Sequence, residues 1–156
     1  MNTLTSTPSA AAPARTPAAP AATLPADDLA RLLLRLTLGL LLLVHGASKL
    51  AGGDAFIVGL VAKAGLPGAL GHLVYVGEVL APLLLVAGVW TRAAALVIAG
   101  NMAVALLLVH SGDFGKLNAF GGWQVELQAF FLLTALVVAL LGAGRFSAGG
   151  THGRWN

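Results

Sequence analysis

An apolar run over residues 29–50 constrains the fold of this chain most strongly. The run reads LARLLLRLTLGLLLLVHGASKL and is long enough to cross a bilayer, since a spanning helix needs about 20 mostly apolar residues. Arg35, His45 and Lys49 nevertheless lie inside it or near its end. Charged side chains inside a bilayer are costly and usually face protein or water. The run therefore requires partner helices that shield these three side chains from lipid.

The low charge content indicates a membrane protein. Hydrophobic residues make up 58% of the sequence and charged residues only 10%, with a mean hydropathy of +0.88, whereas soluble domains average about 25% charged residues. The net charge is +3, but the nine Lys and Arg residues form no basic stripe, which excludes a nucleic-acid-binding protein. The chain has no cysteine, which excludes dithiol relays and iron–sulfur clusters. A redox role would need a quinone, another bound cofactor or a partner protein.

Three further apolar runs supply the partner helices. We predict an all-α integral membrane four-helix bundle in one domain over 27–147, with spanning helices over about 29–50, 68–90, 93–110 and 123–142. Residues 1–26 are rich in Ala and Pro and bury too little apolar surface to offset the entropy of ordering, so we expect a disordered tail. The polar residues 148–156 are expected to form a flexible tail.

The helix ends and connections carry weaker signals. Asp27 or Asp28 is a suitable N-cap for the first helix, and Gly52-Gly53 is a suitable end. Apolar side chains recur at helical spacing within 54–66, which fits a short interfacial helix, but a plain surface loop is the open alternative. Small side chains lie at four-residue spacing on one face of the third predicted helix, a pattern typical of close helix packing: Ala95, Ala99 and Ala103.

Four spans place both termini on the same side of the membrane. Six arginines fall toward that side and three lysines toward the other, so the positive-inside rule favours cytoplasmic N- and C-termini. Helix geometry then places ionisable groups from all four helices in the outer half of the bundle: His45, Lys49, Glu78, His110 and Glu126.

These five groups fit a site for the head group of a quinone or for a small anion. Glu78 and His45 are the candidate catalytic residues, because a buried carboxyl and an imidazole can exchange protons near neutral pH. Lys49, Glu126 and His110 are the candidate substrate-binding residues. The alternative is a structural network that joins the helices through interhelical hydrogen bonds, and for His110 and Glu126 a solvated role near the interface.

Two further polar residues are assigned structural roles, and no metal site is predicted. Arg35 is alone in the inner half of the bundle, and Asn101 lies mid-helix where amides commonly join helices. His45, His110, Glu78 and Glu126 are suitable ligand types, but no two of them have the three- or four-residue spacing of a ligand pair on one helix.

Five short motifs follow one another along the predicted helices and cover about 29–148. They are Arg35-x3-Gly39, His45-Gly46-x2-Lys49-Leu50, Gly77-Glu78-x3-Pro82-Leu83, Gly88-x2-Thr91-Arg92 and Gly142-Ala143-Gly144-Arg145-Phe146-Ser147. In this order they resemble the DoxX family of small four-helix membrane proteins. The resemblance implies a protein of the bacterial cytoplasmic membrane, linked with quinone-coupled oxidation of sulfur compounds or with complexes that handle oxidative or thiol stress. Many members carry Asp soon after the final Ser, whereas this chain continues Ala148-Gly149-Gly150.

Two classes of function stay open at this point. The first is a component of a quinone-linked membrane oxidoreductase system, acting with a protein partner or as a homo-oligomer. The second is a non-catalytic scaffold that assembles other redox proteins in the bilayer. Family membership alone does not decide between them, because one fold can serve several functions.

Overall fold

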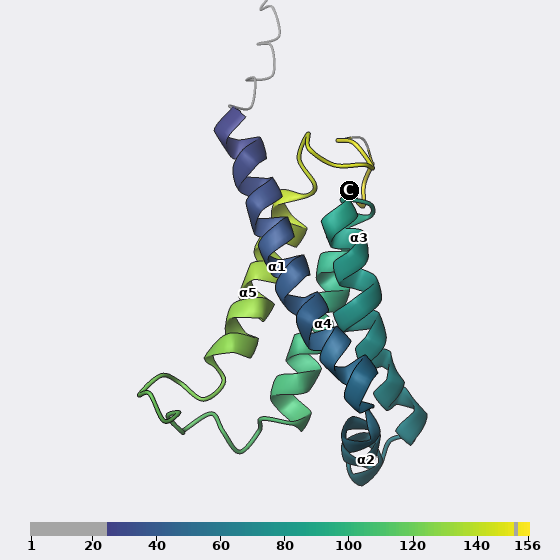
Figure 1. Ribbon diagram of the computed structural model, residues 1–156, viewed down its shortest axis with the longest axis vertical. Helices are drawn as coiled ribbons and strands as arrows, with labels where there is room; N and C mark the ends of the chain where they lie inside the picture. The colour runs from purple at the N-terminus through teal and green to yellow at the C-terminus, as the bar shows by residue number, and fades with distance from the viewer. Residues whose placement is uncertain (1–24, 152) are drawn as a thin grey trace, which may run out of the picture.

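The computed structural model describes residues 25–151 and 153–156, and every extended regular element among them is helical. Figure 1 shows the helices arranged as a bundle, with the C-terminal segment at the same end as the start of α1. The elements are α1 (Pro25–Gly52), α2 (Ala55–Lys63), the 3₁₀ helix η1 (Gly68–Leu73), the π-helical turn η2 (Val76–Leu80), α3 (Ala81–Ala87), α4 (Thr91–Leu108) and α5 (Glu126–Leu141).

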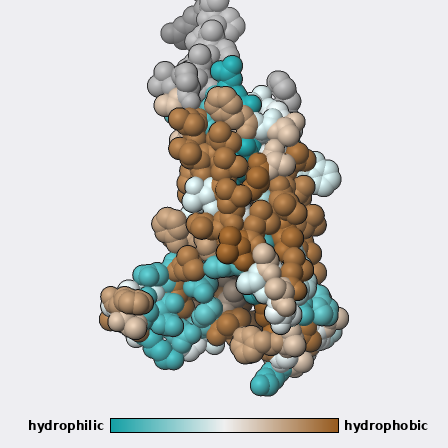
Figure 2. Space-filling view, in the orientation of Figure 1, coloured by the Kyte–Doolittle hydropathy of each residue, from teal (hydrophilic) through white to brown (hydrophobic). Residues whose placement is uncertain are grey.

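Three helical segments are long and apolar enough to cross a membrane: Ala26–Gly52, Gly68–Ala87 and Thr91–Leu108. The fourth apolar helix, α5, has 16 residues, or about 24 Å at 1.5 Å per residue. In Figure 2 an apolar surface covers the middle of the bundle and hydrophilic residues gather toward its ends. This arrangement confirms the predicted all-α membrane bundle.

Several helix boundaries differ from the sequence prediction. Helix α1 begins at Pro25, so Asp27 and Asp28 lie in its first turn and do not precede it as caps. The carboxylate of Asp28 instead accepts a hydrogen bond from the backbone N–H of Arg145, at 3.1 Å. Helix α5 begins at Glu126 and not at Trp123, because Trp123 pairs with Leu117 in an isolated antiparallel bridge.

The connection after α1 is helical, as one of the two open readings predicted. Gly53 takes a φ of 81°, which ends α1, and α2 follows from Ala55 to Lys63. Helix α2 packs mainly against η1. A β-carbon on Gly71 of η1 would come 2.8 Å from the Cα of Val58, so this glycine permits the close approach.

A proline explains the π-helical turn. Pro82 has no backbone N–H, so the carbonyl of Glu78, four residues earlier, loses its helical donor. The local backbone widens to a π turn, in which the N–H of Ala81 bonds to the carbonyl of Val76. The freed carbonyl of Glu78 lies against Gly46 of α1, where a β-carbon would overlap it. The Gly46 and Pro82 positions together bring α1 and η2 into close contact.

The core between α1, α3, α4 and α5 is built mainly from Leu and small residues. Helices α4 and α5 form the most extensive contact, and Ala95 and Ala99 are almost fully buried there. This burial agrees with the packing face predicted from the alanine spacing. The other fully buried side chains of the cluster include Leu38, Leu42, Leu85, Ile98, Ala135 and Val138.

The segment after α5 folds back over one end of the bundle. Arg35 is 1% exposed and donates to the carbonyls of Ala143, at 3.2 Å, and Phe146, at 2.6 Å. The backbone N–H groups of Ala148 and Gly149 bond to carbonyls at the end of α3. Within the range 148–156, for which we predicted a flexible tail, Ala148 and Gly149 are thus bonded to the end of α3, and the flexibility of this range stays a prediction.

Candidate functional site

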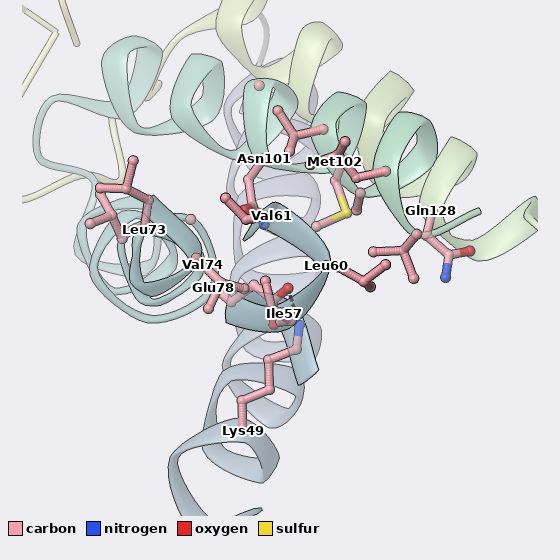
Figure 3. A pocket seen from close by; sticks show the side chains of 18 of the residues that line it. Lys49, Ile57, Leu60, Val61, Leu73, Val74, Glu78, Asn101, Met102 and Gln128 are labelled. Atoms are coloured by element: carbon pink, nitrogen blue, oxygen red, sulfur yellow. Dashed lines mark hydrogen bonds and ion pairs between the residues drawn. The ribbon is translucent and has the colours of Figure 1, made fainter. Parts of the chain in front are cut away.

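A largely apolar cavity of about 610 Å³ lies at the end of the bundle opposite this C-terminal segment. It is bounded by α1, α2, the η1–η2 segment, α4 and α5. Residues Ile57, Leu60 and Val61 line it from α2 (Figure 3). Polar groups reach it from all four of the other elements or, for His110, from the residues just after α4: His45, Lys49, Glu78, Asn101, His110 and Gln128. The site thus joins an apolar wall to a small set of polar groups, which is typical of small-molecule sites.

An ion pair joins α1 to η2 inside this cavity. Lys49 Nζ donates a hydrogen bond to Glu78 Oε1 (Figure 3). The side chain of Glu78 is 5% exposed and that of Lys49 is 30% exposed, so the carboxylate is buried while the ammonium group reaches toward the surface. Glu78 Oε2 is buried and has no hydrogen-bond partner among the described residues.

The π turn and a close glycine contact set the position of Glu78. Gly77 lies directly against the side chain of Asn101 on α4, where a β-carbon would overlap the amide. This contact places the amide of Asn101 beside the helical turn that carries Glu78. Asn101 Nδ2 is also buried and without a partner among the described residues. One acceptor of Glu78 and one donor of Asn101 are therefore buried without a partner among the described residues.

The two histidines of the cavity have different surroundings. The ring of His45 meets the ring of Phe131 edge to face, with centroids 5.6 Å apart. His110 Nδ1 lies 3.2 Å from Asp113 Oδ2, and His110 Nε2 lies 3.1 Å from Gln128 Nε2. This arrangement fits a neutral imidazole that donates from Nδ1 and accepts at Nε2. Gln128 Oε1 is left buried without a partner among the described residues.

The structure brings together four of the five groups predicted to converge. His45, Lys49, Glu78 and His110 line the cavity, and Glu126 does not. Glu126 is exposed at the start of α5 and accepts a hydrogen bond from Asn118 Nδ2 at 3.4 Å. The positions of α5 that line the cavity are Leu127, Gln128 and Phe131, and Glu126, the first residue of α5, lies outside this face.

Sequence reasoning missed Gln128 and the cavity position of Asn101. Gln128 is an isolated amide near the start of an apolar helix, and that isolation was an available signal. Asn101 was assigned to packing, which its contact with Gly77 supports, but it also lines the cavity. Within residues 25–151 and 153–156, no three His, Asp or Glu side chains lie close enough to hold a metal ion.

The fold and the site define a small helical membrane protein with a ligand-sized cavity at one end of its bundle. Comparison with protein families matches residues 30–111 to the family described as DoxX. The match covers slightly more than half of the chain, and the chain belongs to the DoxX family. Comparisons with curated proteins and with solved structures gave no match.

Proposed function

We propose that the cavity binds the head group of a membrane quinone, and that the protein is a component of a quinone-linked oxidoreductase system. The single observation that carries this proposal concerns unpartnered polar atoms. Among the described residues, four buried polar side-chain atoms lack a hydrogen-bond partner, and three of them belong to residues that line the cavity. Such atoms are costly in a folded protein unless a ligand or water satisfies them.

The shape and polarity of the cavity support a quinone. A volume of about 610 Å³ falls within the range of small-molecule sites, roughly 300–1,000 Å³. The apolar lining suits a ring and the start of a hydrocarbon tail. The carbonyl oxygens of a quinone need hydrogen-bond donors, and Asn101 Nδ2 and Lys49 Nζ are donors at the site.

The residues of the site could also move protons. Reduction of a bound quinone to a quinol takes up two electrons and two protons. Glu78 and His45 are the groups in the cavity suited to pass those protons, one through a buried carboxyl and one through an imidazole. The electrons would come from a partner redox subunit, because the chain has no cysteine.

We further propose a location in the bacterial inner membrane with both termini in the cytoplasm. The end of the bundle that holds the C-terminal segment is rich in arginine, which supports this orientation under the positive-inside rule. The cavity would then open in the outer half of the bilayer. A quinone that diffuses within the membrane could reach it there without crossing the whole bundle.

Equilibrium binding of a short-chain quinone to the purified protein in nanodiscs tests the proposal. We expect saturable binding, weakened at least about tenfold by Asn101→Leu, because a buried donor is lost. Glu126→Gln serves as the matched control, since this exposed carboxylate lies outside the cavity. Absence of saturable binding to the unchanged protein, with its melting temperature intact, would contradict a quinone site.

A non-catalytic scaffold is the second candidate, and the segment between α4 and α5 favours it. Phe120 is 98% exposed and Leu117 is 70% exposed on this segment. Large exposed apolar side chains outside the spanning helices are typical of an interaction surface. Replacing both residues with Ser and measuring which subunits co-purify would test the scaffold, while quinone binding to the same variant would stay unchanged.

A further inference from the structure

A second cavity, of about 440 Å³, lies at the opposite end of the bundle from the candidate quinone site. It contains Asp28 of α1, whereas the first cavity contains Lys49 of the same helix. These two positions are separated by about 30 Å along α1 at 1.5 Å per residue. The second cavity therefore has its own chemistry, and inferences about it do not depend on the proposed function.

Three arginines from three different parts of the chain line this cavity. Arg31 comes from α1, Arg92 from the first turn of α4, and Arg145 from the segment after α5. Asp28 is the one carboxylate side chain among the described lining residues. Its oxygens already face Arg145, through the backbone N–H at 3.1 Å and through Nε at 3.8 Å. Among the side chains of the lining, three guanidinium groups therefore face a single carboxylate, an excess of positive side chains.

The side chains of Arg31 and Arg92 are each held by one hydrogen bond within the described residues. Arg31 Nη1 donates to the carbonyl of Leu141, and Arg92 Nε donates to the backbone oxygen of Asn156 at 3.2 Å. A guanidinium group carries five N–H donors. Within the described residues these hydrogen bonds use a single side-chain nitrogen of Arg31 and of Arg92, so the remaining donors can bind an anion. Arginine favours phosphate in particular, because its planar fork matches two oxygens at once.

A buried positive charge next to the cavity adds to this excess. Arg35, one turn along α1 from Arg31, is 1% exposed and contacts only neutral carbonyls among the described residues. No carboxylate of the described chain lies within ion-pair distance of it. An uncompensated buried charge is unfavourable. An anion in the neighbouring cavity would reduce this cost, since the interaction between charges is strong where water is scarce.

The surroundings of the cavity suit a ligand with hydrocarbon chains. Leu141 lines it, and Leu140 and Phe146, beside the lining residues in sequence, are 78% and 56% exposed. Trp90, the residue directly before α4, is 66% exposed, and tryptophan is typical of the membrane–water interface. Basic pockets between spanning helices are known sites for acidic lipid head groups.

We propose that the cavity lined by Arg31, Arg92 and Arg145 binds the phosphate group of an acidic phospholipid. The phosphate accepts hydrogen bonds from the guanidinium groups, and the acyl chains run along the outside of α5. The bound lipid would link α1, α4 and the C-terminal segment, because each of these contributes one arginine.

Native mass spectrometry of the full protein with dioleoyl phosphatidylglycerol tests this site. We expect preferential retention of phosphatidylglycerol over phosphatidylcholine of the same chain length. Affinity should fall at least about tenfold in Arg92→Gln, through loss of charge-assisted hydrogen bonds. Arg154→Gln is the matched control, because Arg154 is exposed near the same end, does not line the cavity and should leave the affinity unchanged.

A second variant separates a loss of lipid binding from a folding defect. Thr151 lines the cavity and is exposed, so Thr151→Glu adds a negative charge without removing an arginine. We expect this variant to lose the preference for phosphatidylglycerol while keeping its melting temperature in detergent. Equal retention of the two lipids by the unchanged protein would overturn the proposal. Displacement of phosphatidylglycerol by millimolar inorganic phosphate would overturn the lipid assignment in favour of free phosphate.

Discussion

The guanidinium group of Arg35 lies directly against Gly88, the residue that ends α3. A β-carbon added at Gly88 would overlap Arg35 Nη1, and this glycine adopts a φ of 71°, in the left-handed region. Arg35 in turn donates to the carbonyls of Ala143 and Phe146 beyond α5. A single buried side chain therefore connects α1, the end of α3 and the C-terminal segment.

We expect Gly88→Ala to destabilise the protein by at least about 2 kcal/mol. A left-handed conformation costs an L-residue about 1–2 kcal/mol, and displacement of the buried guanidinium adds to this. Thermal unfolding in detergent measures the change. Gly100→Ala is the control, because nothing lies within 4 Å of the added carbon and helical Gly→Ala gains up to about 1 kcal/mol. Equal melting temperatures for the two variants would contradict the contact described above.

Arg35→Lys should also destabilise the protein, by about 2 kcal/mol. Lysine carries the same charge but lacks the planar fork, so it cannot reach the carbonyls of Ala143 and Phe146 together. One buried carbonyl would lose its donor. The control is Arg154→Lys, at an exposed arginine near the same end. If both substitutions leave the midpoint of unfolding unchanged, the buried hydrogen bonds of Arg35 contribute nothing.

The hydrophobic runs were sufficient to predict the fold class, because membrane thickness fixes the length of a spanning helix. These runs were less informative about where each helix begins and ends and where its backbone departs from α-helical geometry. The start of α5 depends on the bridge between Leu117 and Trp123, and the widened turn at Glu78 depends on the missing donor of Pro82. The first of these arises from a tertiary contact that hydrophobic periodicity does not encode.

The sequence predicted how deep the residues of the candidate site lie in the membrane, but not in which direction each side chain points around its helix. Counting residues from the helix ends placed His45, Lys49, Glu78 and His110 in the outer half of the bundle, and all four line the cavity. Their catalytic and binding roles stay predictions. Counting could not show that Glu126 faces outward, because one residue along a helix rotates the side chain by about 100°. It also could not detect the arginine cavity, whose members lie far apart in sequence.

The ion pair between Lys49 and Glu78 should show strong thermodynamic coupling. Lys49→Met leaves a buried carboxylate unpaired, which typically destabilises a protein by about 3 kcal/mol or more. Glu78→Gln in the same chain removes that charge, so we expect the double variant to recover most of the loss. Unfolding midpoints of the two single variants and the double variant complete the cycle. Additive losses would show that the two side chains do not interact.

The stability of the loop that follows α4 should decrease at acid pH, because Asp113 becomes protonated there. Hydrogen bonds from Lys116 and then from His110 hold the pKa of this carboxyl below its ordinary value. The folded state therefore binds the proton less tightly than the unfolded loop. The stabilisation is present above the unfolded pKa and is lost as the pH falls through the lowered one. We expect the NMR chemical shifts of the Asp113 side chain to change in that acid range. Asp113→Asn should abolish the transition, and its persistence in this variant would exclude Asp113 as the cause.

Helix α2 covers one side of the cavity that holds Lys49 and Glu78, and its position depends on Gly71. Because a β-carbon at Gly71 would meet the backbone of Val58 at 2.8–2.9 Å, Gly71→Ala must push α2 away from η1. We expect amide hydrogen exchange across Ala55–Lys63 to accelerate by roughly tenfold, as local packing is lost. Gly59→Ala on α2 is the matched control, because nothing lies within 4 Å of its added carbon. If Gly71→Ala leaves exchange in α2 unchanged, this helix is held over the cavity by contacts other than its packing on η1.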